Sequence, residues 1–154
     1  MNLFKRKYFL FFISILLILP FSSFRESGDG PGFSLKVEVS GIRNSSGSIL
    51  FALYNREDAF PDEHYKKYFK KLTGKIVNGA SSVTFENLPE GKYAVNILHD
   101  ENNDGKIKKG IILPREGIGF SNFQSIGFSN RPTFSKASFS MLSDKKIKVN
   151  IIYL

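Results

Sequence analysis

The sequence of 154 residues contains no cysteine, no tryptophan and only two histidines. The absence of cysteine excludes a disulfide scaffold, a cysteine nucleophile, a lipid-modified N-terminal cysteine and every metal site built on thiolates. A transition-metal site would need both His64 and His99 together with carboxylates, so we do not expect one. No segment alternates strand and helix patterns, which argues against a nucleotide-binding α/β fold. The length fits one domain, with or without a targeting segment.

The N-terminus has the pattern of a secretory signal peptide. A basic cluster at residues 5–7 precedes an uncharged apolar run, Tyr8–Leu19, and small polar residues follow it. The run is shorter than the roughly 20 residues that span a membrane. We therefore predict a signal peptide over residues 1–24 and export to the periplasm or the extracellular space. Because a small-residue A-x-A cleavage site is missing, an uncleaved N-terminal anchor is the alternative.

The chain carries a moderate net positive charge. Residues 1–24 hold three basic residues and no acidic ones, so their removal lowers the formal net charge from +8 to +5. Such an excess gives a weak preference for anionic surfaces and does not by itself indicate nucleic acid. We expect no nucleic-acid partner, and membrane contact only through an uncleaved signal segment.

Beyond a flexible leader at residues 25–32, the chain to residue 154 has the period-2 alternation of β-strands. Asn78-Gly79 gives a strong two-residue hairpin signal. The expected strands are residues 33–40, 48–54, 71–77, 81–86, 92–99, 137–142 and 146–154. About seven strands with turns at this spacing predict an all-β, immunoglobulin-like antiparallel β-sandwich over residues 33–154.

Two insertions interrupt the strand pattern. In the first, residues 55–70, Asp62 is placed to cap a short helix in which Tyr65, Tyr68 and Phe69 recur at helical spacing. The second, residues 100–136, is rich in glycine and proline. A connection of this length inside a compact domain is uncommon and usually functional.

Five motifs, taken in order, resemble a family of exported bacterial proteins known as domain of unknown function 2141. They are GIRNSSG (41–47), AFPD (59–62), FENLPEGKY (85–93), HDENNDG (99–105) and GIGFSN (117–122). The resemblance covers Leu35 to Leu154 and implies an exported β-sandwich domain with no established activity. The segment Leu88–Tyr93 is also similar to a step of transthyretin-like, or prealbumin-like, sandwich modules, which supports the fold only.

The acidic loop after the fifth expected strand matches the first half of a calcium loop. Its candidate ligands are the side chains of Asp100, Asn102 and Asp104 and the carbonyl of Lys106. Ile111 stands where the twelfth position would supply a bidentate glutamate, and Lys108 occupies the ninth position. Two interpretations stay open: a weak calcium site, or a turn in which these side chains bond their own backbone.

A histidine next to an aspartate suggests general-base chemistry. His99 precedes Asp100, and Ser121 or Ser125 would be the nucleophile of such a hydrolase. No G-x-S-x-G nucleophile elbow is present, and a packed histidine explains His99 equally well. We therefore expect no enzyme activity and keep a hydrolase using His99 and Asp100 as an alternative.

The most unusual tract of the chain combines phenylalanines with glycine, serine and asparagine near basic residues. It predicts a ligand or partner surface made of aromatic anchors and a basic rim. The residues concerned are Phe120, Asn122, Phe123, Phe128, Arg115 and Arg131. The alternative is that the rings, with Phe134, fold back to cover an open end of the sandwich.

Taken together, these patterns favour a non-catalytic exported binding or accessory module whose ligand and whose envelope or extracellular partner are unknown. Its recognition surface would lie in residues 100–131, with calcium as a possible ligand and no other cofactor expected. The alternatives are the hydrolase and a purely structural envelope protein.

Overall fold

A computed structural model of the protein describes residues 32–107 and 116–154. The predicted signal peptide, residues 1–24, and the leader up to residue 31 lie outside the described residues. The strands are β1 (Phe33–Ser40), β2 (Ser48–Tyr54), β3 (Lys70–Gly74), β4 (Ser81–Leu88), β5 (Gly91–Asp100), β6 (Ile118–Phe120), β7 (Phe139–Met141) and β8 (Lys145–Asn150). Two short helical segments are η1 (Glu57–Ala59) and α2 (Phe134–Ala137). No helix in the described part of the chain is long and apolar enough to cross a membrane.

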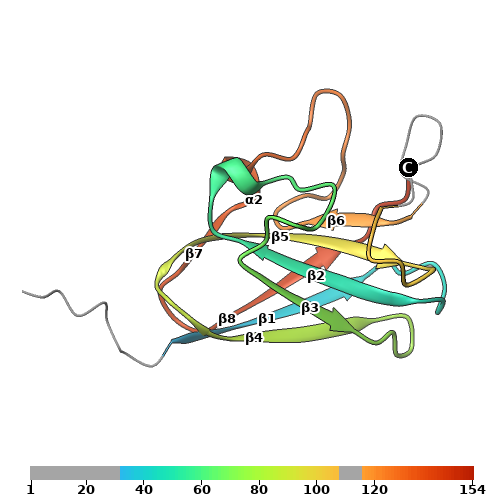
Figure 1. Ribbon diagram of the computed structural model, residues 1–154, viewed down its shortest axis with the longest axis horizontal. Helices are drawn as coiled ribbons and strands as arrows, with labels where there is room; N and C mark the ends of the chain where they lie inside the picture. Colours follow the sequence, from blue (N-terminus) through green and yellow to red (C-terminus); the bar gives the residue numbers. More distant parts are fainter. Residues whose placement is uncertain (1–31, 108–115) are drawn as a thin grey trace, which may run out of the picture. The chain divides into compact units, whose positions relative to one another are not determined.

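The strands form two sheets that pack face to face, which confirms the predicted β-sandwich (Figure 1). One sheet has the order β4-β1-β8; the other has the order β3-β2-β5-β6, with β7 also paired to β5. The prediction of a wholly antiparallel arrangement is wrong for one pair, because β1 and β8 run parallel. These two strands are neighbours in the sheet but lie far apart in sequence, so the path of the chain between them, and no local pattern, sets their relative direction.

The core between the sheets follows the period-2 pattern of the sequence. In β1, Leu35, Val37 and Val39 are buried while the residues between them point to solvent or are partly covered. The same core contains side chains from both sheets, among them Phe51, Leu53, Phe85, Val95, Ile97, Met141 and Val149. Alternate apolar residues on each strand therefore account for the cohesion of the two layers.

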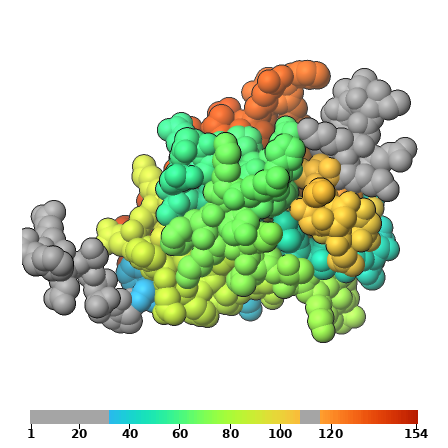
Figure 2. All heavy atoms as spheres, viewed as in Figure 1, coloured from blue at the N-terminus to red at the C-terminus, as the bar shows by residue number. Residues whose placement is uncertain are grey.

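A second apolar core covers the other face of the β2-β5-β6 layer. Here the side chains come from β2, β5 and β6, from the first insertion and from the segment between β6 and β7. They are Leu50, Ala52, Tyr54, Ala59, Phe60, Tyr65, Ala94, Leu98, Ile118, Phe120, Phe123 and Ala137. Figure 2 shows the insertion and β3, in green, spread over the front of the molecule. Because β2 is covered on both faces, its sequence SILFALY is apolar almost throughout.

The helix expected within residues 55–70 is not formed, and this prediction is wrong. The insertion contains only the 3-10 turn η1, followed by a turn organised by the buried Asp62. The Asp62 carboxylate accepts hydrogen bonds from the backbone N–H groups of His64 (3.0 Å), Lys66 (2.6 Å) and Lys67 (2.6 Å). Tyr65 has a φ of 50°, which a right-handed helix does not allow. Asp62 thus satisfies the backbone of a compact loop instead of capping a helix.

The Asn78-Gly79 turn forms as predicted. Both residues have positive φ (51° and 72°), and Val77 and Ala80 exchange backbone hydrogen bonds of 2.8 and 3.0 Å. The strands on either side of the turn then separate: β3, before it, pairs with β2, and β4, after it, pairs with β1. The hairpin therefore opens at its base into the two different sheets.

Candidate functional site

The structure divides the phenylalanines of the aromatic tract between core and surface. Phe120 and Phe123 are buried, with exposed fractions of 6% and 4%. Phe120 packs edge-on against Phe60 at a centroid distance of 5.6 Å and against Phe123 at 6.2 Å. Phe134 is partly buried beside Phe60. These rings fill the second core.

Asn122 and Ser121 fasten this tract to α2. The side-chain amide of Asn122 donates to the carbonyls of Lys136, Ala137 and Ser138 at 3.3, 3.2 and 3.1 Å. The buried Ser121 hydroxyl donates to the Ala137 carbonyl (2.7 Å) and accepts the backbone N–H of Val95 (2.9 Å). Both side chains therefore hydrogen-bond to backbone groups and fix the position of the segment that contains α2.

Phe128 differs from the other rings because 94% of it is exposed. It lies on a turn closed by hydrogen bonds between the backbones of Gly127 and Asn130, and the Asn130 amide donates to the Ser125 carbonyl at 2.8 Å. The Arg131 guanidinium carbon is 5.9 Å from the Phe128 ring centroid. Figure 1 shows the loop between β6 and α2, in orange, projecting from the body of the domain. We call residues 124–131 the Phe128 finger. Arg115 lies outside the described residues.

The acidic loop is closed by its own hydrogen bonds. The Asp100 carboxylate, which is buried, accepts the backbone N–H groups of Asp104 (3.1 Å) and Gly105 (2.8 Å). The Asn102 side-chain oxygen accepts the same Asp104 N–H at 3.2 Å, and Asp104 accepts the Lys106 N–H at 2.8 Å. This is the pattern of consecutive Asx-type turns.

The same geometry brings the oxygens of Asp100 and Asn102 onto one N–H group, so they lie near each other. Glu116, which is also buried, accepts the backbone N–H of Glu101 at 3.2 Å. Within residues 32–107 and 116–154, no three histidine, aspartate or glutamate side chains form a cluster suited to a metal ion. The weak calcium site predicted from the side chains of Asp100, Asn102 and Asp104 and the carbonyl of Lys106 stays a prediction.

His99 is fully buried and fixed by two hydrogen bonds. Its Nδ1 is 2.7 Å from the Tyr153 hydroxyl, and its Nε2 is 2.9 Å from the Ser46 carbonyl oxygen. Because a carbonyl only accepts, the neutral imidazole carries its proton on Nε2 and accepts the Tyr153 proton at Nδ1. His99 and Asp100 are consecutive in β5, so their side chains point to opposite faces. The structure does not bring the two together as an acid–base pair.

Glu101 lies next to this histidine and binds Arg43 through two hydrogen bonds of 2.7 Å. The Arg43 hydrogen bonds lower the pKa of the Glu101 carboxyl to about 2, assisted by Asn44. Arg43 also lies over the Tyr153 ring, 4.5 Å from its centroid. No pattern in the sequence indicated that these residues form a cluster, although Arg43 belongs to the GIRNSSG motif and Tyr153 to the last alternating segment.

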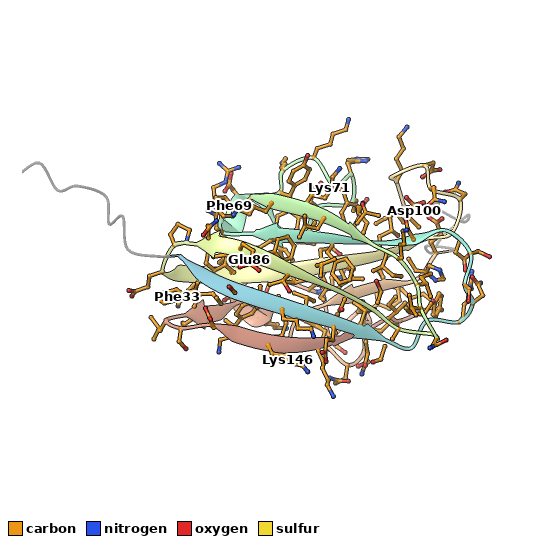
Figure 3. All side chains as sticks on the ribbon, turned by 90° about the horizontal axis from the view of Figure 1, so that it is seen from below. Phe33, Phe69, Lys71, Glu86, Asp100 and Lys146 are labelled. Atoms are coloured by element: carbon orange, nitrogen blue, oxygen red, sulfur yellow. The ribbon has the colours of Figure 1, made fainter. Side chains whose placement is uncertain are left out.

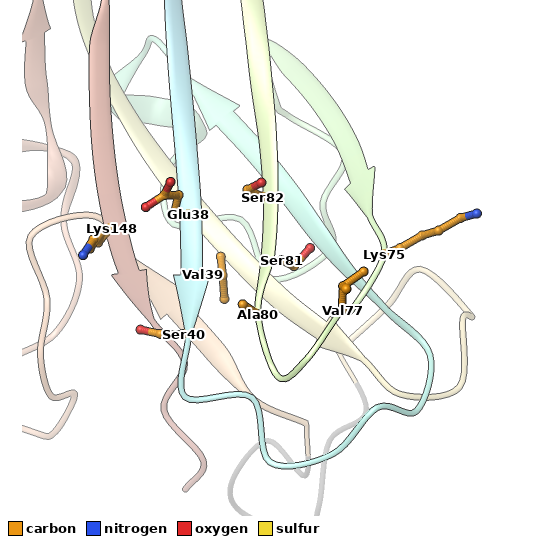
Figure 4. A pocket seen from close by; sticks show the side chains of 9 residues that line it. All are labelled: Glu38, Val39, Ser40, Lys75, Val77, Ala80, Ser81, Ser82 and Lys148. Atoms are coloured by element: carbon orange, nitrogen blue, oxygen red, sulfur yellow. The ribbon is translucent and has the colours of Figure 1, made fainter.

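A shallow pocket of about 590 Å³ lies at the end of β1 and β4 near the Asn78-Gly79 turn. It is lined by Glu38, Val39, Ser40, Lys75, Val77, Ala80, Ser81, Ser82 and Lys148. Figure 4 shows Lys75 and Lys148 on opposite sides of this pocket, with their ammonium groups pointing away from each other. The lining charges do not converge on a point where one ligand group would sit.

The region that contains most of these features matches a known family. Residues 37–150 fit the family described as an uncharacterized protein conserved in bacteria, DUF2141. The chain belongs to the DUF2141 family. The match extends from within β1 to the end of β8, so the acidic loop, His99 and the Phe128 finger lie inside the matched region, whereas Tyr153 lies beyond it.

Comparison with curated proteins gives no match. Among solved structures, the chain is similar to the crystal structure of a fimbrial assembly protein from Parabacteroides distasonis, at 12% sequence identity and a TM-score of 0.41. The similarity covers 79% of this chain and 53% of the other, so the present chain spans about half the length of that protein.

Proposed function

We propose that this DUF2141 protein is an exported, non-catalytic binding module that contacts its partner through the Phe128 finger. The observation that carries this proposal is the 94% exposure of Phe128 on a hydrogen-bonded turn, while neighbouring rings of the same tract are buried. Covering a phenylalanine side chain removes apolar surface from water and is worth about 1.5–3 kcal/mol. Arg131 beside the ring adds a cationic group at the edge of the same contact.

A non-catalytic role is supported by the way the candidate catalytic groups are used. His99 bonds Tyr153 and Ser46, Asp100 bonds its own loop, and the Ser121 proton is donated to a carbonyl. A hydrolase would need a nucleophile, a base and an orienting acid within hydrogen-bond reach. The other alternative, a structural envelope protein, would not depend on Phe128.

Export and fold type are further parts of the proposal. The basic cluster and apolar run within residues 1–24 support export, and fractionation of a Gram-negative host expressing the full chain tests it. Full-length protein found only in the soluble cytoplasm would contradict export. We also propose that the sandwich is of the immunoglobulin-like, prealbumin-like type, which an experimental structure would test.

The partner surface is tested by introducing a photo-cross-linking amino acid at Phe128 in expressing cells, with Leu142 as the matched control. Leu142 is also a large exposed apolar residue, at 66%. We expect a discrete adduct from position 128 and none from position 142. The cross-linked partner is then purified and its affinity measured by titration calorimetry. Phe128→Ser should weaken binding by about tenfold or more, and Leu142→Ser should leave it unchanged. Equal effects of the two substitutions would contradict the proposal.

A further inference from the structure

The two sides of the sandwich differ in how the sheets meet. On one side the sheets are joined by the bridge between Ile118 and Ile152, whose backbones exchange hydrogen bonds of 3.0 and 2.8 Å. On the other side the edge strands are β3 and β4, which belong to different sheets and run next to each other (Figure 1). In the described part of the chain, backbone pairing between the segments that contain them is confined to Val77 and Ala80. Beyond that bridge the side is open.

The contacts of Glu86 show which backbone groups of β4 face this open side. Lys70 reaches across from β3 and its ammonium donates to the Glu86 carbonyl, so the peptide groups of Glu86 point away from β1. Because N–H and C=O directions alternate along a strand, Thr84 and Ser82 present their backbone groups to the same side. Val83 and Phe85 lie between them and pair with Val37 and Leu35 of β1. The outer edge of β4 thus offers a row of hydrogen-bonding groups to another strand.

A groove follows this row. It has a volume of about 420 Å³ and is lined by Lys70, Lys71, Leu72, Thr84, Phe85, Glu86 and Asn87. Leu72 of the lining is 38% exposed, and so is Phe69, which lies just before β3 and packs against Tyr93. Figure 3 shows Lys71 on β3, Phe69 just before this strand and Glu86 on the neighbouring β4. Exposed apolar side chains and the outward-facing backbone groups of β4, of which the Glu86 carbonyl is bonded by Lys70, therefore occur on one surface.

The charges around the groove determine what kind of strand fits. Lys70 and Lys71 line it, and the one acid in its lining, Glu86, is already bonded by the Ser34 hydroxyl at 2.6 Å. A strand that pairs with β4 replaces the bond between Lys70 and the Glu86 carbonyl. The displaced ammonium then needs a counter-charge, which a carboxylate of the incoming strand supplies.

We propose that the open edge of β4 accepts an extended segment of a partner protein in which apolar side chains alternate with acidic ones. The backbone of that segment pairs with Ser82, Thr84 and Glu86. Its apolar side chains contact Leu72 and Phe69, and its carboxylates meet Lys70 and Lys71. In the free protein Lys70 blocks the edge and limits pairing between copies, which is a common protective use of lysine. This surface and the Phe128 finger are made of different residues.

The probe for this test is a fluorescent nine-residue peptide in which valine alternates with glutamate and threonine. Binding is measured by fluorescence polarisation with the full chain. A second peptide carries N-methyl groups on alternate residues, which removes the N–H groups that pair with β4. A third replaces each glutamate with lysine. We expect both to bind about tenfold more weakly than the first, because one lacks strand pairing and the other is repelled by the lysines.

Variants of the protein locate the binding site. Thr84 lies opposite Lys36 of β1, but alternation along β4 points its N–H to the open side. Thr84→Pro removes that N–H, so β4 should keep its place in the sheet. It should weaken the acidic peptide about tenfold, while the matched Thr84→Ala, which keeps the N–H, should change the affinity less than about twofold. Lys70→Glu should reverse the preference between the acidic and the lysine peptide.

Three results of these experiments bear on whether β4 binds an acidic strand. Equal affinities of the plain and the N-methylated peptide, or an unchanged affinity for Thr84→Pro, would overturn the proposal. If Thr84→Pro fails to fold by circular dichroism, the N-methylated peptide and Lys70→Glu decide in its place. If sedimentation shows a dimer that Thr84→Pro dissociates and the acidic peptide does not bind, the occupant is a second copy of the chain and the proposal is wrong.

Discussion

Removing one hydroxyl group, in Tyr153→Phe, tests the hydrogen-bond assignment around His99. The hydroxyl donates to His99 Nδ1 at 2.7 Å and accepts the backbone N–H of Arg43 at 3.0 Å. His99 is fully buried, so its Nδ1 loses its hydrogen-bond donor, whereas Arg43 is exposed and its N–H can bond water. A buried acceptor left without a partner costs about 1–3 kcal/mol. We therefore expect Tyr153→Phe to lower the free energy of unfolding by that amount.

The assay is urea unfolding at pH 7, followed by circular dichroism, with Tyr68→Phe as the matched control. Tyr68 is 38% exposed, so loss of its hydroxyl should change stability by less than about 0.5 kcal/mol. In a His99→Leu background the acceptor is absent, and Tyr153→Phe should then have a much smaller effect, giving a coupling free energy of about 1 kcal/mol or more. If Tyr153→Phe is as mild as Tyr68→Phe, or if its effect is the same in both backgrounds, the hydrogen bond between Tyr153 and His99 does not stabilise the fold as described.

Three further predictions follow from the same region. The pairing with Arg43 lowers the pKa of Glu101 from 4.5 to about 2 in the folded state, so it stabilises the fold above pH 4.5 and this contribution is lost as the pH falls towards 2. Glu101→Gln should therefore lose less free energy of unfolding than the wild type between pH 4.5 and 2, as measured by acid unfolding. Gly117→Ala would place a methyl group 2.3 Å from the Ile151 side chain and should destabilise the domain by about 1–3 kcal/mol, whereas Gly127→Ala points into open space and should be neutral in thermal melts. Millimolar calcium should raise the unfolding midpoint slightly and Asp104→Ala should abolish the increase; an unmoved curve would leave the loop as an ordinary Asx-rich turn.

The strands of this protein could be predicted because their pattern is local. The expected strands 33–40 and 48–54 coincide with β1 and β2, and 81–86 and 92–99 lie within β4 and β5. Alternation of apolar and polar side chains is a property of the strand itself and needs no knowledge of its neighbours. The Asn78-Gly79 turn was predictable for a similar reason, since positive φ is easiest for these residues.

The prediction of a helix at residues 55–70 was wrong because the helical spacing of Tyr65, Tyr68 and Phe69 does not reveal which groups Asp62 will bond. In the folded chain, the buried Asp62 carboxylate accepts hydrogen bonds from backbone N–H groups of the loop. The short β6 was missed because three residues are too few for a period to be recognised.

The strand pattern, the β-sandwich, the exclusion of thiol chemistry and the unusual aromatic tract could all be inferred from the amino-acid sequence. The distinction between core and surface phenylalanines came from the folded structure, because Phe120, Phe123 and Phe128 have the same side chain and similar neighbours in sequence. The folded structure also decided that His99 meets Tyr153 across 54 positions of sequence and that β3 and β4 stand open as edges of different sheets. Burial and strand pairing depend on which distant segments meet in space, and a local pattern does not contain that information.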